Sequence, residues 1–187
     1  EHGGAAPDII AEDADLDDNL PLIAKGGFYH AGQVCVSVQR VFAQRSIARE
    51  VADRLSATAA SWTIGDPGLE SSAIGPLIRP REVDRVHDWV QEAINDGAQC
   101  LHGGDHNSPT SYQSTVLFAP AQSSKVSQLE IFGPVSCVYP YDDIEAAIAQ
   151  ANSLDVAFQA SVLTRNIDTA MHCYSRLDAS AVIVNDH

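Results

Sequence analysis

Apolar residues along the chain follow two periods, which predict helices that alternate with short strands. Helical spacing marks segments that begin near residues 15, 46, 82, 142 and 166. Short apolar runs between them predict strands at 7–13, 36–44, 99–104, 158–164 and 181–185. After "TVLFAP" at 115–120, "LEIFGPVSCVYPY" at 129–141 predicts a turn inside two apolar runs. This alternation argues for an α/β fold, with a mostly parallel sheet that is flanked by helices.

Polar residues next to these segments predict where the helices begin. Ser46, Asp142 and Asn166 each stand where an N-cap is expected. Glu145 follows Asp142 by three positions, as in a capping box. Gly32 is the expected end of the first helix, and residues 106–114 predict a polar loop.

Composition narrows the classes of protein. The 187 residues, 45% of them hydrophobic, favour one domain with a sizeable core. A formal charge of −14 disfavours nucleic acids and anionic membranes as partners. No apolar run approaches the roughly 20 residues of a membrane-spanning helix.

Cysteine spacing argues against a disulfide framework or a zinc site. The four cysteines are far apart, and none forms a C-x-x-C pair. They are Cys35, Cys100, Cys137 and Cys173. We expect free thiols in a reducing cytoplasm, with all but Cys35 in the core.

Glycine-containing turns carry the residue types that chemistry needs. They are "EHGGAAP" at 1–7, "AGQVC" at 31–35 and "EIFGPV" at 130–135. Each is weak alone, because a lone cysteine before a valine-rich strand is usually a packed thiol. Their occurrence together, in this order and spacing, gives the pattern its specificity.

The chain resembles the catalytic domain of the NAD(P)-dependent aldehyde dehydrogenase superfamily over nearly every residue. "EHGG" is similar to the family's E-L-G-G motif, "GQVC" to its G-Q-x-C motif and "EIFGPV" to its E-x-F-G-P-V motif. "IGDP" and "GPLI" are similar to its middle loop. His30 and His2 depart from the family's usual Asn and Leu.

The resemblance implies roles for individual residues. Cys35 matches the nucleophile, which forms a thioester with the substrate, and Glu1 matches the base that activates the hydrolytic water. Glu130 matches the residue that binds the nicotinamide ribose, and Phe132 one that contacts the cofactor, NAD or NADP. These types suit the chemistry, since thiolates are strong nucleophiles and one carboxylate can accept both ribose hydroxyls.

The resemblance also implies that residues 1–187 are an isolated catalytic domain. No G-x-G-x-x-G motif occurs, and the chain has no room for a dinucleotide-binding domain. The family's C-terminal oligomerisation segment, which joins subunits, is absent as well. Because the family has this segment, the parent enzyme is expected to be a homo-oligomer. We expect the fragment alone not to oxidise aldehydes, because nothing holds the nicotinamide beside Cys35.

Alternatives remain at this stage. "SVQR" after Cys35 is similar to the branch that acts on small aldehydes, such as lactaldehyde, phosphonoacetaldehyde or glyceraldehyde 3-phosphate. A CoA-acylating enzyme is a second possibility, although that branch usually lacks the residue matched by Glu1. A structural or interaction domain without catalysis is a third.

Two further motifs have ordinary explanations. "HGGDH", from His102 to His106, offers two imidazoles and a carboxylate, but metal sites in such loops are uncommon. We therefore expect no metal. Asn185, in "VND", is expected to fix a loop rather than to catalyse.

Overall fold

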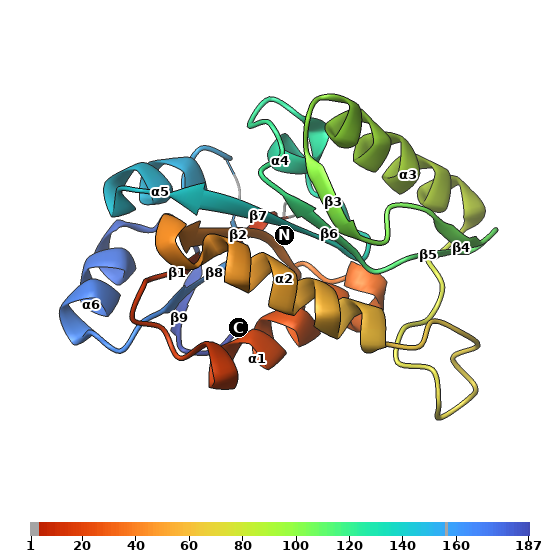
Figure 1. Ribbon diagram of the computed structural model, residues 1–187, viewed down its shortest axis with the longest axis horizontal. Helices are drawn as coiled ribbons and strands as arrows, with labels where there is room; N and C mark the ends of the chain where they lie inside the picture. The colour runs from red at the N-terminus through yellow and green to blue at the C-terminus, as the bar shows by residue number, and fades with distance from the viewer. Residues whose placement is uncertain (1–3, 156) are drawn as a thin grey trace.

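A seven-stranded sheet runs through the molecule in the order β3-β6-β7-β2-β1-β8-β9 (Figure 1). The computed structural model describes residues 4–155 and 157–187. Every neighbouring pair in this sheet is parallel except β3 with β6. Its strands are β1 (Ala6–Ile10), β2 (Val38–Gln44), β3 (Gln99–His102), β6 (Thr115–Phe118), β7 (Val135–Tyr141), β8 (Gln159–Leu163) and β9 (Ala181–Val184). The predicted α/β class and mostly parallel sheet are confirmed.

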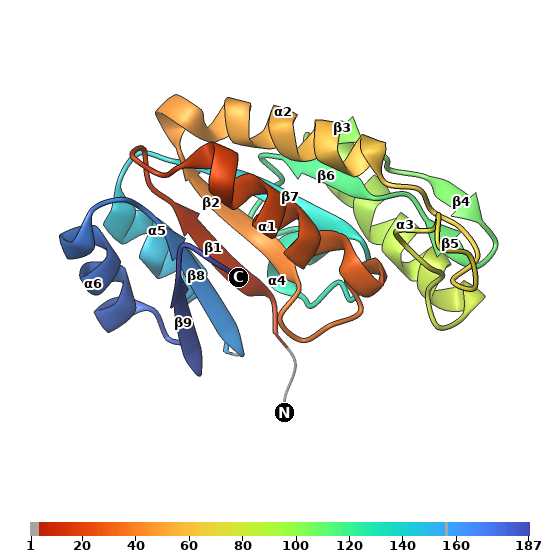
Figure 2. The same cartoon turned by 90° about the horizontal axis from the view of Figure 1, so that it is seen from below.

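Helices cover both faces of the sheet. Figures 1 and 2 show α1 and α2 on one face and α3, α4 and α5 on the other. The helices are α1 (Leu16–Phe28), α2 (Arg45–Ser61), α3 (Pro80–Asn95), α4 (Lys125–Gln128), α5 (Ile144–Ala151) and α6 (Ile167–Arg176). Among the described residues, no helix is long and apolar enough to cross a membrane.

Two predicted helix caps are wrong, and one is confirmed. The side chain of Gln44 accepts from the Ser46 backbone N–H and caps α2, so the helix begins one residue before Ser46. Asp143, not Asp142, caps α5, because Asp142 pairs with Arg45 at 2.6 Å. Asn166 caps α6 as predicted.

The first helix ends four residues before the predicted stop. α1 ends at Phe28, and Tyr29–Gly32 form a short 3₁₀ segment, η1. His30 and Ala31 have left-handed backbones, with φ of 51° and 56°, which an α-helix cannot continue through. The chain therefore turns sharply before it enters the Cys35 loop.

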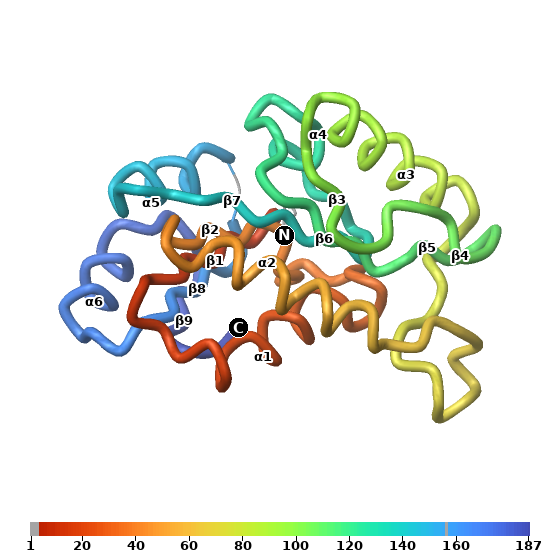
Figure 3. Tube along the Cα trace, in the orientation of Figure 1, coloured from red at the N-terminus to blue at the C-terminus, as the bar shows by residue number. Residues whose placement is uncertain are grey.

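The segment predicted as a polar loop contains a small hairpin. Its strands are β4 (His106–Ser108) and β5 (Ser111–Tyr112). Tyr112 is only 1% exposed and anchors the hairpin, although the surrounding sequence is too polar to predict strands. The long loop before it, at residues 62–79, projects from the body (Figure 3).

Asn185 fixes the end of the sheet, as its sequence context suggests. Its side chain donates to the Thr164 carbonyl and accepts from the Thr164 N–H, both at 2.9 Å. Its own φ of 54° makes it a turn residue. The loop after β8 is thereby joined to the end of β9.

Asp8 is a buried carboxyl in β1, between β2 and β8. Its Oδ2 atom has no hydrogen-bond partner among the described residues. Burial raises the pKa of Asp8 to about 7, and the Ser161 hydroxyl on β8 acts weakly in the opposite direction. The folded protein therefore holds this proton more tightly than the unfolded chain does.

We predict that Asp8→Asn removes a pH dependence of stability. With a raised pKa, the contribution of Asp8 is fully present below about pH 4 and is lost as the pH rises through about 7. Between pH 5 and 7.5, the free energy of unfolding of the variant should gain about 2–3 kcal/mol relative to the wild type. Urea denaturation at both pH values measures this, and equal differences at the two would contradict it.

Candidate active site

The predicted motifs meet at one edge of the sheet. Gly4 precedes β1, Cys35 precedes β2 and Glu130 precedes β7. These strands are neighbours and run parallel, so their amino ends lie side by side. The topology thus brings together residues that are up to 126 positions apart in the chain.

Cys35 lies in the loop between η1 and β2, where it is half-buried. Gly32, with φ of 69°, lies before this loop and packs against the "FGP" turn. A Cβ at Gly32 would overlap the carbonyl group of Gly133. Glycine is needed both for the left-handed backbone and for this close approach. The cysteine loop and the "FGP" turn are therefore packed backbone to backbone.

Gln33 ties the cysteine loop to the middle loop that the resemblance singled out. Its Nε2 donates to the Pro76 carbonyl at 3.2 Å, and its Oε1 accepts from the Ile78 N–H at 2.9 Å. Nε2 also donates to the His30 carbonyl at 3.0 Å. One amide side chain thus joins the loop that carries Cys35 to the middle loop.

Gly4 connects the third motif to the other two. Its N–H donates to Oε1 of Glu130 at 3.1 Å, and a Cβ at Gly4 would lie 3.1 Å from the Cys35 carbonyl oxygen. The backbone before β1 therefore passes between Cys35 and Glu130. Glu1 and His2 lie outside the described residues.

Gln39 holds the segment that carries Glu130. From β2, its Nε2 donates to the carbonyls of Val126 at 3.0 Å and Leu129 at 2.7 Å. Its Oε1 accepts from the Ile131 N–H at 2.9 Å. The residues on both sides of Glu130 are thus bonded to one buried side chain. Sequence reasoning missed this role, although a polar residue in an apolar strand was the available signal.

Phe132 is exposed on a strained backbone beside Glu130. The residue is 42% exposed, and its φ is 50°. A bulky residue rarely adopts this conformation, and such outliers cluster at functional sites. The turn therefore presents an aromatic ring to solvent next to a carboxylate.

Burial raises the pKa values of the other three thiols, although one of them, Cys100, is less buried than expected. Cys137 and Cys173 are buried, and burial raises their pKa values to about 12 and about 11. Cys100 is only half-buried, so its assignment to the core is wrong in part. Burial nevertheless raises its pKa too, and its Sγ lies 3.3 Å from the His102 carbonyl oxygen.

Comparison with known proteins agrees with this arrangement. The family model described as "Aldehyde dehydrogenase family" matches residues 1–187. This chain belongs to the aldehyde dehydrogenase family. The sequence-based recognition of that family is confirmed.

Relatives in the aldehyde dehydrogenase family are longer than this chain. It is 34% identical over its whole length to 3-sulfolactaldehyde dehydrogenase of Priestia aryabhattai, and 37% identical to benzaldehyde dehydrogenase [NAD(+)] of Pseudomonas putida. It spans 39% and 38% of their lengths. A crystal structure of lactaldehyde dehydrogenase from Escherichia coli, 31% identical, superposes with a TM-score of 0.94 over 99% of this chain and 39% of that one.

We predict that Gln39→Leu destabilises this aldehyde dehydrogenase domain. The change leaves the buried Val126 carbonyl and Ile131 N–H, and the part-buried Leu129 carbonyl, without their partner, at about 1–3 kcal/mol for each buried group left unsatisfied. A total loss of about 2–4 kcal/mol in the free energy of unfolding is expected after partial relaxation.

The matched control is Gln122→Leu, at an exposed position before α4. It should change stability by no more than about 0.5 kcal/mol. Chemical denaturation of both variants gives the comparison, and equal effects would show that the Gln39 hydrogen bonds contribute little.

Proposed function

We propose that this chain supplies the nucleophile and part of the cofactor site of an NAD(P)-dependent aldehyde dehydrogenase, which oxidises a small aldehyde to a carboxylic acid. The observation that carries the proposal is the meeting of Cys35, Gly4 and Glu130 at one sheet edge. Membership of the family supports it.

Cys35 is proposed to form and break the covalent bond to substrate. Its thiolate attacks the aldehyde carbon, which becomes a tetrahedral thiohemiacetal. Loss of hydride from that carbon gives a thioester, and water then displaces the thiolate to release the acid. A thiolate suits both steps, because it is a strong nucleophile and a good leaving group.

NAD or NADP would accept the hydride. The residues of the "EIFGPV" turn fit such a group, since a half-buried carboxylate lies beside an exposed aromatic ring on the same turn. Glu130 would accept hydrogen bonds from the ribose hydroxyls, and Phe132 would contact the cofactor's apolar surface. The name of the Pseudomonas putida relative, benzaldehyde dehydrogenase [NAD(+)], is consistent with this choice.

Glu1 is proposed as the base that takes a proton from the hydrolytic water. The residues that follow it lead directly to Gly4, which lies against the carbonyl of Cys35. A carboxylate can act as the general base that takes a proton from such a water. A deacylating water distinguishes this reading from a CoA-acylating enzyme.

The substrate class and setting are part of the same proposal. Relatives named for sulfolactaldehyde and lactaldehyde favour a small, polar aldehyde for the "SVQR" branch. Residues 1–187 would form the catalytic domain of a homo-oligomeric enzyme that works in the cytoplasm. The four free thiols are consistent with a reducing compartment.

We predict that Cys35→Ser and Glu130→Gln separate nucleophile from cofactor binding in the intact enzyme. Cys35→Ser should lower both aldehyde oxidation and ester hydrolysis by more than about 1,000-fold, because both need the thiolate. Glu130→Gln should raise the KM for the cofactor by about 10- to 100-fold, since charge-assisted hydrogen bonds are lost. Ester hydrolysis, which needs no cofactor, should persist in Glu130→Gln.

Steady-state kinetics with an aldehyde and with an aryl ester measure both effects. Full activity in Cys35→Ser would favour a non-catalytic role for this chain. Loss of ester hydrolysis in Glu130→Gln would mean that Glu130 acts on the cysteine loop and not on the cofactor.

We predict that Glu1→Gln in the intact enzyme slows deacylation far more than acylation. One equivalent of NADH should appear as a burst, followed by a steady rate that is lower by about 100- to 10,000-fold, as expected when a general base is removed. Stopped-flow absorbance measures both phases. A burst that is itself slowed equally would assign Glu1 to activation of the Cys35 thiol.

A further inference from the structure

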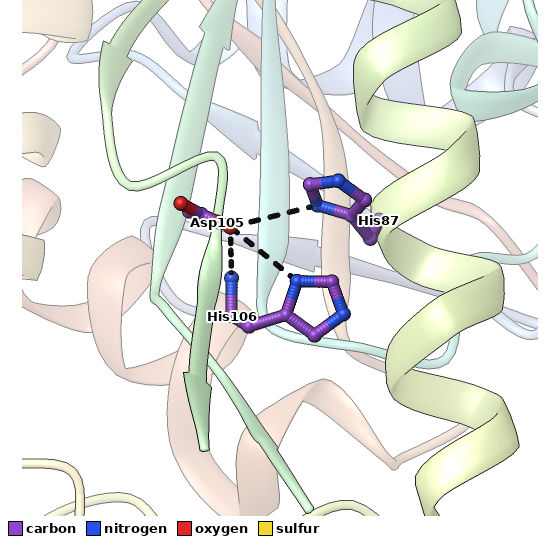
Figure 4. Close-up of side chains that lie close together, drawn as sticks. All are labelled: His87, Asp105 and His106. Atoms are coloured by element: carbon purple, nitrogen blue, oxygen red, sulfur yellow. Dashed lines mark hydrogen bonds and ion pairs between the residues drawn. The ribbon is translucent and has the colours of Figure 1, made fainter. Parts of the chain in front are cut away.

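Two histidines and a carboxylate converge between α3 and the start of β4, in a cluster made of His87, Asp105 and His106 (Figure 4). His87 comes from the middle of α3, and His106 begins β4. None of the three belongs to the motifs at the amino ends of β1, β2 and β7. The proposed aldehyde dehydrogenase chemistry leaves this cluster without a role.

The donor atoms point at one another. Figure 4 shows both imidazoles directed toward the Asp105 carboxylate. The Nδ1 atoms of His106 and His87 lie 3.3 and 4.0 Å from Oδ1 of Asp105. One ligand atom from each residue falls within 4.8 Å of the others. Modest side-chain rotation would place each of these atoms about 2.0–2.2 Å from one shared ion, the distance at which nitrogen and oxygen bind Zn²⁺.

A buried ring supports the two imidazoles. Tyr112, 1% exposed, makes edge contacts with His87 and His106 at centroid distances of 6.0 and 5.9 Å. The two histidine rings lie 4.4 Å apart. His87 Nδ1 is also 3.4 Å from the Tyr112 hydroxyl. The imidazoles are therefore held close together before any ligand arrives, which lowers the entropy cost of binding.

The surrounding charge is negative. Asp84, one turn before His87 on α3, places Oδ1 3.4 Å from Nε2 of His106. Asp105 pairs with both histidines, and the whole chain carries a formal charge of −14. Such surroundings raise the local concentration of cations.

We propose that His87, Asp105 and His106 bind a divalent transition-metal ion, with Zn²⁺ as the best match. Two imidazoles and one carboxylate form a donor set that Zn²⁺ uses with a water molecule in the fourth position. The "HGGDH" motif supplies Asp105 and His106 to this cluster, but its first histidine, His102, is not part of it. His102 lies in β3, and His87 from α3 takes its place.

The metal would join α3 to the β4–β5 hairpin. α3 also carries Arg85, whose Nη2 donates to the Ile131 carbonyl at 2.7 Å, next to Glu130. A bound ion would therefore stabilise the helix that supports one side of the candidate active site. The proposal does not depend on the catalytic function of Cys35.

Calorimetric titration of the purified protein with ZnCl₂ tests the proposal, in a Cys35→Ser background so that the half-exposed thiol does not compete. We expect the protein to bind one equivalent of Zn²⁺ with high affinity. His87→Gln and His106→Gln should each weaken this affinity by more than about 10-fold. Co²⁺ gives a second readout, because its visible absorption reports nitrogen and oxygen ligation.

His102→Gln is the matched control, since it removes a histidine of the same motif that lies outside the cluster. Its affinity for Zn²⁺ should equal that of the background protein. Absence of binding, or binding that His87→Gln and His106→Gln leave unchanged, would overturn the proposal. Equal weakening by His102→Gln would do the same, because it would move the site to the loop motif.

Discussion

The arrangement of the candidate site depends on direct backbone contact between turns. Gly32 lies against the carbonyl of Gly133, and Gly4 lies against that of Cys35 while donating to Glu130. A side chain at Gly32 would overlap the neighbouring turn, and one at Gly4 would be tightly confined. The glycines therefore let three neighbouring parallel strands begin close enough for their preceding turns to share one site.

Buried polar side chains hold this edge in place from within the sheet. Gln39 bonds the backbone on both sides of Glu130, while Arg40 donates to the Ala5 carbonyl at 2.9 Å and to the carbonyls of Gln150 and Ala151. Burial lowers the pKa of Arg40 to about 10, so it stays protonated near neutral pH. Neighbouring residues of β2 thus fix the segments before β7 and before β1. The fold uses hydrogen bonds to carbonyls here, because a buried guanidinium needs all its donors satisfied.

The site's position departs from the usual rule for open α/β sheets. Ligands ordinarily bind beyond the carboxyl ends of the strands. At that edge, this molecule has a hollow lined by acidic and polar residues, including Glu12, Asp13 and Asp142. Cys35 and Glu130, the candidate site residues, lie instead at the amino ends, in the loops that precede neighbouring strands. An expectation from fold class alone would have placed the candidate site at the carboxyl ends of the strands.

The sequence by itself determined the α/β class, the strand–helix alternation and the motifs that identify Cys35 and Glu130, because period and local motif are properties of short stretches. It also placed the Asn166 cap, whose partners are two and three residues away. Tertiary structure decided what depends on distant partners. Asp142 pairs with Arg45 while Asp143 caps α5, and Gln39 bonds to partners about 90 positions away. His87, and not His102, lies beside His106. Each outcome depends on which elements pack together, and no local pattern contains that information.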